Sequence, residues 1–222
     1  MRVIAGTAKG HRLKAPVGLS TRPTSDKIKG VIFSMVESLW WEEVSASPEG
    51  ASMVTSGDAF LVYRGKRVLD LYAGTGALGI EALSRGVDWT DFVESSIKCC
   101  RLIGENLERT HLWEQGRVYH CDVEKAMEGI VPGDEAIESG YDLVLFDPPY
   151  ADPRISETLE AIGHAQWVRP GALLVVEHSK RVILAAGYGG LRIARTRRHG
   201  DTCITIYRWR KEAGLVANSG VG

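Results

Sequence analysis

Apolar and polar positions follow two different patterns along this chain. Within residues 28–39 the apolar positions recur every three or four residues, which predicts an amphipathic helix. After residue 66, short apolar runs typical of buried strands alternate with helical patterns. The predicted strands are Val68–Tyr72, Asp91–Glu94, Arg117–Cys121, Tyr141–Phe146 and Ala172–Glu177, and the predicted helices are Ala77–Ser84, Ile97–Arg109 and Ser156–Ile162. This alternation indicates a mainly parallel sheet that is covered by helices on both faces.

The two ends of the chain carry patterns of antiparallel structure. Residues 2–14 alternate around Gly6 and Gly10, which predicts a β-hairpin. Near the C-terminus, Thr202–Trp209 is β-branched and aromatic with a period of two, and Leu191–Arg195 is expected to pair with it. The parallel sheet is therefore predicted to end in an antiparallel strand.

The charge is distributed unevenly, although the 222 residues carry a net charge of only −1. Residues 1–29 and 192–211 each carry +6, which leaves −13 for the rest of the chain. Such segments are typical of nucleic-acid contact, and equally of solvated strand faces. The four cysteines show no spacing typical of a zinc site or a disulfide framework, and no apolar run is long enough to span a bilayer. We expect a cytoplasmic protein without a metal.

A glycine-rich motif follows the first predicted strand. Gly74, Gly76 and Gly79 satisfy the pattern G-x-G-x-x-G, which allows a tight turn and close approach of the backbone to a ligand. Glu94 lies twenty residues beyond Gly74, at the end of the next strand, where a carboxylate can bind ribose hydroxyls. The carboxylate of Asp70 would repel a pyrophosphate but suits an ammonium group. The motif therefore favours S-adenosylmethionine over NAD, and a nicotinamide dehydrogenase stays as an alternative.

Two later strand ends carry further candidate residues. Asp122 can accept a hydrogen bond from an adenine amine beside an apolar wall at Val123, but it is equally typical of a helix N-cap. The prolines of Asp147-Pro148-Pro149-Tyr150 force the chain out of the sheet at its carboxyl edge. There Asp147 and the Pro148 carbonyl could accept the two N–H groups of a nucleobase amine, while Tyr150 stacks on the base. An ordinary Asp-Pro turn is the alternative.

Taken together, DLYAGTGALG, Glu94, Asp122 and DPPY resemble the class I S-adenosylmethionine-dependent methyltransferases that act on amino groups. The runs RVIAGTAKGHRLKAP and TRPTSDKIKGVIFSMV are similar to the RsmD-type bacterial family, which methylates the N2 amine of one guanine in 16S rRNA. The resemblance implies a Rossmann-like α/β fold with a seven-stranded, mainly parallel sheet, an antiparallel last strand and an N-terminal β-hairpin. Two departures are Gly30, at a position where the family has an acid, and residues 45–64, which look like an insertion.

The resemblance also implies roles for individual residues. Methionine and ribose would be held by Asp70, Tyr72, Gly74, Thr75, Gly76 and Glu94, adenine by Asp122 and Val123, and the target base by Asp147, Pro148, Pro149 and Tyr150. The implied partner is 16S rRNA or a small-subunit particle, and the candidate RNA contacts are Arg2, Lys9, Arg12, Lys14 and Arg22.

These roles define the expected organisation of the chain. Residues 1–25 would form an RNA-contacting hairpin and linker, residues 26–211 the methyltransferase domain, and residues 212–222 a disordered tail. We expect a monomer. The alternatives are an adenine-N6 methyltransferase of DNA or RNA, for which 222 residues leave little room for target recognition, and a non-catalytic ribosome-assembly protein, against which the intact DPPY motif argues.

Overall fold

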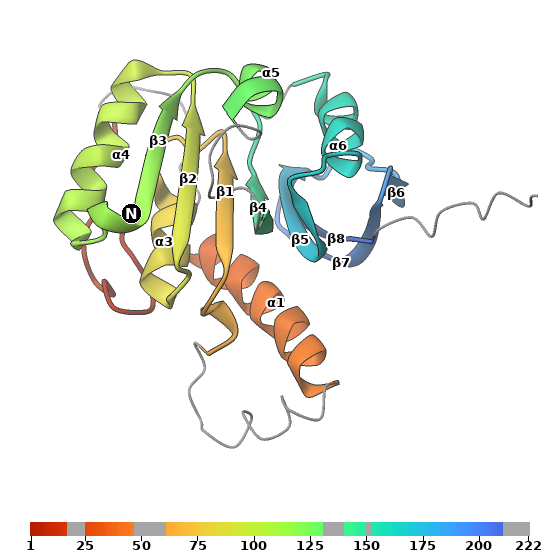
Figure 1. Cartoon of the computed structure of the whole chain (residues 1–222), viewed down its shortest axis with the longest axis horizontal. Helices are drawn as coiled ribbons and strands as arrows, with labels where there is room; N and C mark the ends of the chain where they lie inside the picture. Colours follow the sequence, from red (N-terminus) through yellow and green to blue (C-terminus); the bar gives the residue numbers. More distant parts are fainter. Residues whose placement is uncertain (17–24, 47–60, 131–139, 150–151, 211–222) are drawn as a thin grey trace, which may run out of the picture.

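The computed structural model describes residues 1–16, 25–46, 61–130, 140–149 and 152–210. One eight-stranded sheet runs through these residues in the order β3-β2-β1-β4-β5-β8-β7-β6 (Figure 1). The strands are β1 (Arg67–Leu71), β2 (Trp89–Glu94), β3 (Gly116–His120), β4 (Tyr141–Phe146), β5 (Val168–Ser179), β6 (Gly187–Tyr188), β7 (Leu191–His199) and β8 (Thr202–Trp209). The helices are α1 (Asp26–Ser45), α3 (Ala77–Arg85), α4 (Ile97–Thr110), α5 (Val123–Lys125) and α6 (Ile155–Gly163), with short turns at Leu61–Tyr63, Trp113–Gln115 and Ala126–Ile130.

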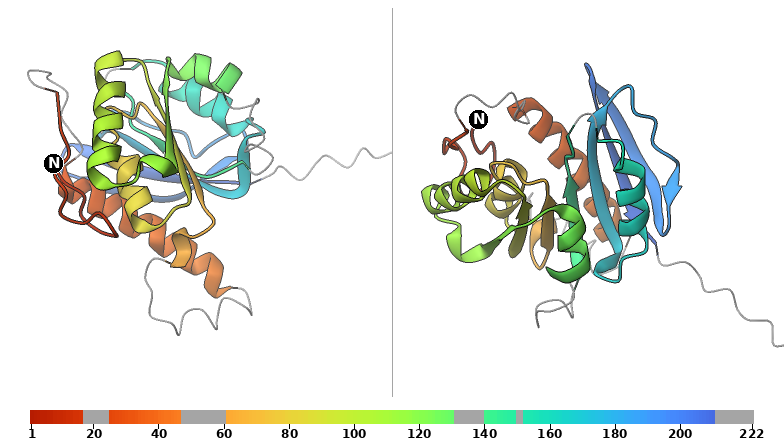
Figure 2. Two further views of the ribbon diagram at one scale, coloured as in Figure 1. Left: turned by 60° about the vertical axis from the view of Figure 1, so that its left-hand side comes forward. Right: turned by 90° about the horizontal axis from the view of Figure 1, so that it is seen from above.

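Strands β1 to β5 are parallel, and β8 and β7 continue the sheet in antiparallel pairing. Residues of α1, α3 and α4 pack on one face of the sheet, and residues of α5 and α6 on the other. This gives three layers, which Figure 2 shows from two further sides. Val68 and Leu69 point into opposite layers, which explains why the central strands read as continuous apolar runs. The predicted fold class is confirmed.

The order of the strands reverses between β1 and β4. The chain proceeds outward from β1 to β2 and β3, then returns to place β4 on the other side of β1. In open α/β sheets, ligands bind outside the carboxyl ends of the strands at such a switch point. The turn after β1 and the turn after β4 therefore lie where the fold favours a site.

The two arms of the predicted N-terminal hairpin lie antiparallel. The Val3 amide donates to the His11 carbonyl at 3.0 Å and the Gly10 amide to the Val3 carbonyl at 2.9 Å, around one β-bridge between Arg2 and Arg12. The hairpin is short because its turn bonds to α3: the Ile4 and Ala5 amides donate to the Glu81 carboxylate, and the Thr7 amide donates to the Ser84 carbonyl at 2.7 Å. We call residues 1–16 the N-terminal segment.

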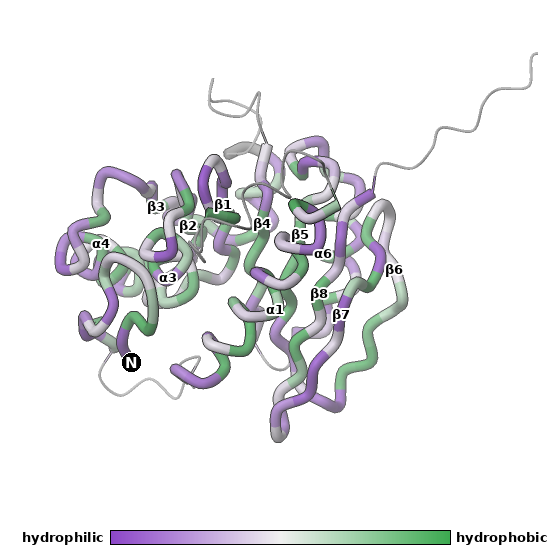
Figure 3. The backbone as a smooth tube through the Cα atoms, turned by 90° about the horizontal axis from the view of Figure 1, so that it is seen from below, coloured by the Kyte–Doolittle hydropathy of each residue, from purple (hydrophilic) through white to green (hydrophobic). Residues whose placement is uncertain are grey.

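The sheet has eight strands rather than seven because β6, which is two residues long, pairs with the start of β7. The predicted pairing of Leu191–Arg195 extends further, to His199, and turns at Gly200 with φ +63°. Polar residues dominate β7, as its colouring in Figure 3 shows.

The segment predicted as an insertion, residues 45–64, lies partly outside the described residues, as do Arg22, Tyr150 and the predicted tail. Its last part belongs to the core. Tyr63 is fully buried, packs edge-on against Trp40 and donates a hydrogen bond of 2.9 Å to Glu37 of α1. Gly30 leaves room beside α1, because a Cβ there would meet only Ile4 Cδ1, at 3.7 Å.

In the described part of the chain, no helix combines the length and apolarity needed to cross a membrane.

Candidate active site

The glycine-rich motif forms the turn from β1 into α3. Tyr72, Gly74 and Gly76 all have positive φ, at 59°, 57° and 76°, so the chain reverses within a few residues. Gly79 is needed for packing, since a Cβ there would lie 2.3 Å from the Phe92 ring and 2.9 Å from an oxygen of Asp70. The predicted strand, tight turn and helix are confirmed. We call residues 72–76 the glycine loop.

Asp70 lies beneath this loop rather than facing solvent. Its side chain is 2% exposed, and Oδ2 accepts a hydrogen bond from the Gly79 amide at 2.9 Å. Burial, together with the nearby charges of Asp147 and Glu94, raises the pKa of Asp70 to about 8 against the opposing effect of that bond. The three carboxyl groups therefore share one neighbourhood at the switch point.

Glu94 joins the glycine loop to the start of α4. Its Oε2 accepts from the Gly74 amide at 2.8 Å and its Oε1 accepts from the Ser96 amide at 2.7 Å. Ser96 is the N-cap of α4, where its hydroxyl accepts from the Cys99 amide. Each carboxylate oxygen can accept a second bond. Glu94 is half-buried and can therefore hold the loop and accept a ligand hydroxyl as well.

Asp122 takes the capping role that the sequence left open. It is the N-cap of α5, and its Oδ1 accepts from the Lys125 amide at 2.8 Å. Val123 is 3% exposed and packs in the core on the α5–α6 side of the sheet. Both residues lie at the carboxyl edge, after β3, so a contact with adenine stays a prediction.

The Asp-Pro-Pro run leaves the sheet directly after β4, whose six residues are all buried. Asp147 is half-buried, Pro148 is buried and Pro149 is exposed, so within this run the chain passes from the buried strand to the surface. The Pro149 carbonyl accepts from the Asp152 amide at 2.9 Å, which begins the turn toward α6. Tyr150 lies outside the described residues.

Tyr72 connects the glycine loop to the segment after β4. Its hydroxyl donates to Asp152 Oδ2 at 3.3 Å, and its ring packs edge-on against Phe146 with 5.5 Å between centroids. Burial, with the negative charge of Asp152, raises the pKa of Tyr72 to about 12. The hydroxyl is therefore a hydrogen-bond donor at neutral pH.

Sequence reasoning missed two residues at this edge. Asn106 is fully buried in α4 and bonds to the glycine loop at Thr75, but its position inside a helical pattern gives no local signal. Glu177 lies near the end of β5, one position after Val176, which pairs with Phe146 of β4. It is 8% exposed, and a buried acid in an apolar strand was a signal that the sequence did offer.

The residues predicted to contact RNA differ in whether they form ion pairs within the protein. Arg2 pairs with Asp26 at 3.3 Å and Lys14 with Glu105 at 2.5 Å. Lys9 and Arg12 are exposed, and within the described ranges neither forms an ion pair. Arg22 lies outside those ranges.

The basic side chains of residues 192–211 lie in two different environments. Arg195 pairs with Glu42 at 2.6 Å and Arg208 with Glu43 at 3.2 Å, so two of its charges fasten β7 and β8 to α1. Arg197 and Arg198 are exposed near the end of β7. His199 and Ser179 both pair with Thr202, so this end of β7 lies at the same sheet edge as the ends of β4 and β5.

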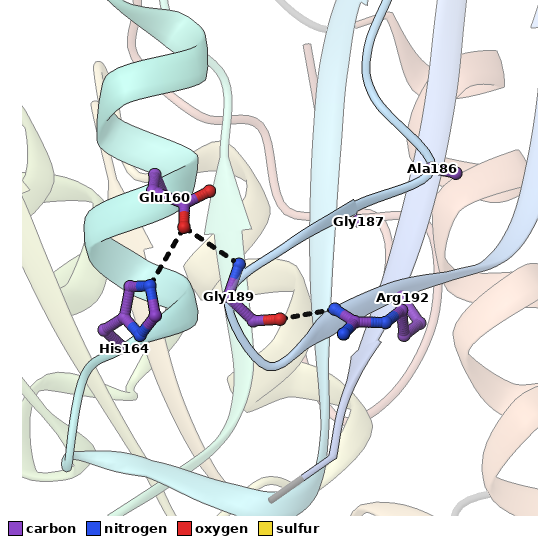
Figure 4. A pocket seen from close by; sticks show the side chains of 6 residues that line it. All are labelled: Glu160, His164, Ala186, Gly187, Gly189 and Arg192. Carbon is purple, nitrogen blue, oxygen red and sulfur yellow. Dashed lines mark hydrogen bonds and ion pairs between the residues drawn. The ribbon is translucent and has the colours of Figure 1, made fainter. Parts of the chain in front are cut away.

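A surface pocket of about 530 Å³ lies elsewhere, between the end of α6 and the β6–β7 turn (Figure 4). It is lined by Glu160, His164, Ala186, Gly187, Gly189 and Arg192. Its polar groups bond to one another: Glu160 accepts from the Gly189 amide at 3.2 Å and lies 2.9 Å from His164 Nε2. Because α6 runs back from the carboxyl edge, this pocket lies at the amino edge, away from the glycine loop. In the described ranges, no group of three or more acids, histidines or cysteines could hold a metal ion.

The sequence and the structure of this chain match those of known proteins. The model of the family described as "Conserved hypothetical protein 95" matches residues 1–208. The chain is 35% identical over 210 residues to "Putative rRNA methyltransferase YlbH" of Bacillus subtilis, covering 95% of this chain and 100% of that protein. It is 25% identical over 179 residues to "Ribosomal RNA small subunit methyltransferase D" of Escherichia coli K12, covering 80% and 74%. The structure matches that of "Putative methyltransferase yhhF from Escherichia coli" with a TM-score of 0.68 at 24% identity, covering 95% and 98%.

Proposed function

Because the chain belongs to the family described as conserved hypothetical protein 95 and is similar to proteins named as rRNA methyltransferases, we propose that it is an S-adenosylmethionine-dependent rRNA methyltransferase. The finer proposal is transfer of the methyl group to the exocyclic N2 amine of a guanine in 16S rRNA. The observation that carries the methyltransferase proposal is that the glycine loop follows β1 and Asp147 follows β4, so the two turns lie side by side at the switch point, where Leu71 pairs with Phe146.

The residues around the glycine loop fit such a cofactor. Gly74 and Thr75 are half-exposed, and a Cβ at Gly74 would meet only a backbone oxygen at 3.9 Å, so the loop leaves room for a ligand against its backbone. Glu94 would accept hydrogen bonds from the ribose, and Asp122 with Val123 would hold the adenine. When bound, the cofactor supplies a methyl group that is activated on a sulfonium.

Asp147 and Pro148 would act on the target amine. A nucleobase amine is a weak nucleophile because its lone pair is delocalised into the ring. If the Asp147 carboxylate and the Pro148 carbonyl accept its two N–H bonds, the nitrogen can become pyramidal and present its lone pair. The carboxylate also stabilises the positive charge that builds on nitrogen, and it can accept the proton that is lost. The two prolines hold these acceptors on a stiff backbone.

The basic surfaces support an RNA substrate. Exposed Lys9 and Arg12 belong to the N-terminal segment, while Arg197 and Arg198 lie at the carboxyl edge beyond β5. RNA phosphates bound at these side chains would bring a nucleotide to the edge that holds Asp147. The amine of a paired guanine is hard to reach, so the base would be flipped out or taken from a single-stranded loop.

The test follows a labelled methyl group. The protein is incubated with labelled cofactor and either 30S particles or naked 16S rRNA from cells that lack it, and the RNA is digested to nucleosides. Label in N2-methylguanosine is expected. Label in N6-methyladenosine would replace guanine by adenine as the target. Absence of transfer to both substrates would refute the rRNA methyltransferase proposal.

A further inference from the structure

Asn106 of α4 uses its whole amide to join two segments that are far apart in the sequence. Its side chain is 0% exposed. Oδ1 accepts from the Lys14 amide at 2.7 Å, while Nδ2 donates to the Lys14 carbonyl at 3.1 Å and to the Thr75 carbonyl at 3.0 Å. Lys14 belongs to the N-terminal segment and Thr75 to the glycine loop, so one side chain fixes the backbone of both.

The rest of the N-terminal segment is fastened to the helix that the glycine loop begins. Glu81 of α3 accepts from the Ile4 amide at 2.9 Å and from the Ala5 amide at 3.1 Å. The hydroxyl of Ser84 accepts from the Ala8 amide at 2.9 Å. The segment thus bridges α3, which follows the glycine loop, and α4, which follows Glu94. Both helices start at the candidate cofactor site.

We propose that Asn106 is a positioning residue that couples the N-terminal segment to the glycine loop, so that RNA bound at the segment and cofactor bound at the loop each raise the affinity for the other. The RNA half of this inference rests on the proposed function. The cofactor half concerns the glycine loop alone.

The physical basis is the cost of an unmet hydrogen bond inside the protein. If the glycine loop moves away from Nδ2, the Thr75 carbonyl and one N–H of Asn106 lose their partners, and a buried polar group without a partner is penalised. Movement of Lys14 breaks two further bonds to the same amide. A ligand that orders either segment therefore favours the bonded arrangement of the other. Such coupling is reciprocal, because the two binding equilibria share one thermodynamic cycle.

The experiment measures the dissociation constant of S-adenosylhomocysteine by calorimetry, with and without saturating naked 16S rRNA. The reaction product is used because it cannot donate a methyl group. For the wild-type chain we expect the RNA to tighten binding at least about fivefold. In Asn106→Leu this factor should fall to about one, and affinity without RNA should fall about tenfold. Asn106→Asp keeps the acceptor for the Lys14 amide but loses both donors, and it should lose the coupling as well.

Thr110→Val is the matched control. Thr110 lies one turn further along α4 and is 4% exposed, and within the described residues its hydroxyl bonds only to the Asn106 and Leu107 carbonyls of the same helix. This variant removes a buried polar group without touching the glycine loop, and it should keep the wild-type coupling. Equal loss of coupling in Thr110→Val, or wild-type coupling in both Asn106 variants, would overturn the inference.

The two proposals fail differently. If the wild-type chain neither binds nor methylates 16S rRNA, the proposed function and the RNA half of this inference both fall. The cofactor half is then decided without RNA: weaker binding in Asn106→Leu and unchanged binding in Thr110→Val support it, and equal affinities in all three proteins overturn it.

Discussion

Asp70 and Gly79 are joined by a hydrogen bond of 2.9 Å that closes the turn between β1 and α3 from below. The acceptor is a carboxyl group that is 2% exposed and lies near two other acids, so its proton affinity is raised. The bond holds the first turn of α3 against the end of β1. Asp70 thus supports the glycine loop from within the core, whatever contact it makes with a ligand.

This burial predicts a pH-dependent contribution to stability. The pKa of Asp70 is about 8 in the folded protein and near 4 in an unfolded chain, so folding favours the protonated form. The contribution is fully present below about pH 4 and is lost as the pH rises toward 8. Asp70→Asn stays neutral at every pH. The difference between its melting temperature and that of the wild type should therefore shift in favour of the variant as the pH rises from 5 to 8. Parallel curves for the two proteins would contradict the raised pKa.

Glu94→Gln should weaken cofactor binding. The amide nitrogen of glutamine cannot accept a hydrogen bond, so either the Gly74 or the Ser96 amide loses its partner. Bonds to a charged group contribute about 1.5–3 kcal/mol, which corresponds to at least about a tenfold rise in the dissociation constant of S-adenosylhomocysteine. Glu108→Gln, on the exposed side of α4, is the control and should bind as the wild type does. Calorimetry measures both.

Asp147→Ala should abolish most methyl transfer while cofactor binding stays. Loss of the carboxylate removes an acceptor for the amine and the charge that opposes the positive nitrogen, so kcat should fall by about 10²–10³. Asp142→Asn is a control on the same strand, at the opposite end of β4, where Asp142 pairs with Arg169 at 3.0 Å. It should cost stability but little kcat. Full activity in Asp147→Ala would refute the proposed mechanism.

The double variant Arg197→Glu, Arg198→Glu should bind RNA more weakly and with a lower dependence on salt. Removing two phosphate contacts to single-stranded RNA should reduce the slope of log K against log salt by about 1.4. Arg192→Glu provides the comparison, because Arg192 is exposed on the same strand but at the amino edge. Filter binding at several salt concentrations separates the two. The double variant changes the charge by −4 and Arg192→Glu by −2, so if Arg192→Glu loses about half as much binding free energy as the double variant, the effect is one of net charge and not of the edge.

The buried ion network under the N-terminal segment should be sensitive to the removal of Glu81. This fully buried carboxylate lies 3.3 Å from Lys29 Nζ and accepts from Arg85 Nε at 3.0 Å. Glu81→Gln removes the buried charge between the two cations, leaving Lys29 with Asp26 at 4.0 Å and Arg85 with Glu37 at 2.6 Å, and should cost about 3–5 kcal/mol in the free energy of unfolding. Lys29→Met should cost less, because burial already lowers the pKa of Lys29 and Glu81 keeps Arg85. Urea unfolding tests this order.

Local signals carried most of what could be predicted. The glycine loop could be predicted from the spacing of Gly74, Gly76 and Gly79, because each glycine is required by a turn or a close contact within one βα unit. The exit of the chain from the sheet at Pro148 and Pro149 could also be predicted, because proline cannot donate a ladder hydrogen bond whatever the rest of the fold.

Contacts between distant segments could not be predicted in this way. Asn106 lies 92 residues from Lys14 and 31 from Thr75, and nothing in the sequence around it distinguishes it from a polar residue on the exposed face of a helix. The +6 of the C-terminal segment gave no indication that Arg195 and Arg208 pair with acids of α1, more than 150 residues away. The hairpin at residues 2–14 was predicted from its own alternation, but the bonds from its turn to α3 were not, because Glu81 and Ser84 lie more than 70 residues away.

The docking of the N-terminal segment also has a consequence for synthesis on the ribosome. Residues of the N-terminal segment bond to partners 76 to 92 positions later, at Glu81, Ser84 and Asn106. The segment can therefore complete its native contacts only after α4 has left the exit tunnel, and a nascent chain that ends before α4 lacks the bond from Asn106 to the glycine loop. The glycine loop therefore gains its bond to α4 only after the 31 residues that separate Thr75 from Asn106 have been translated.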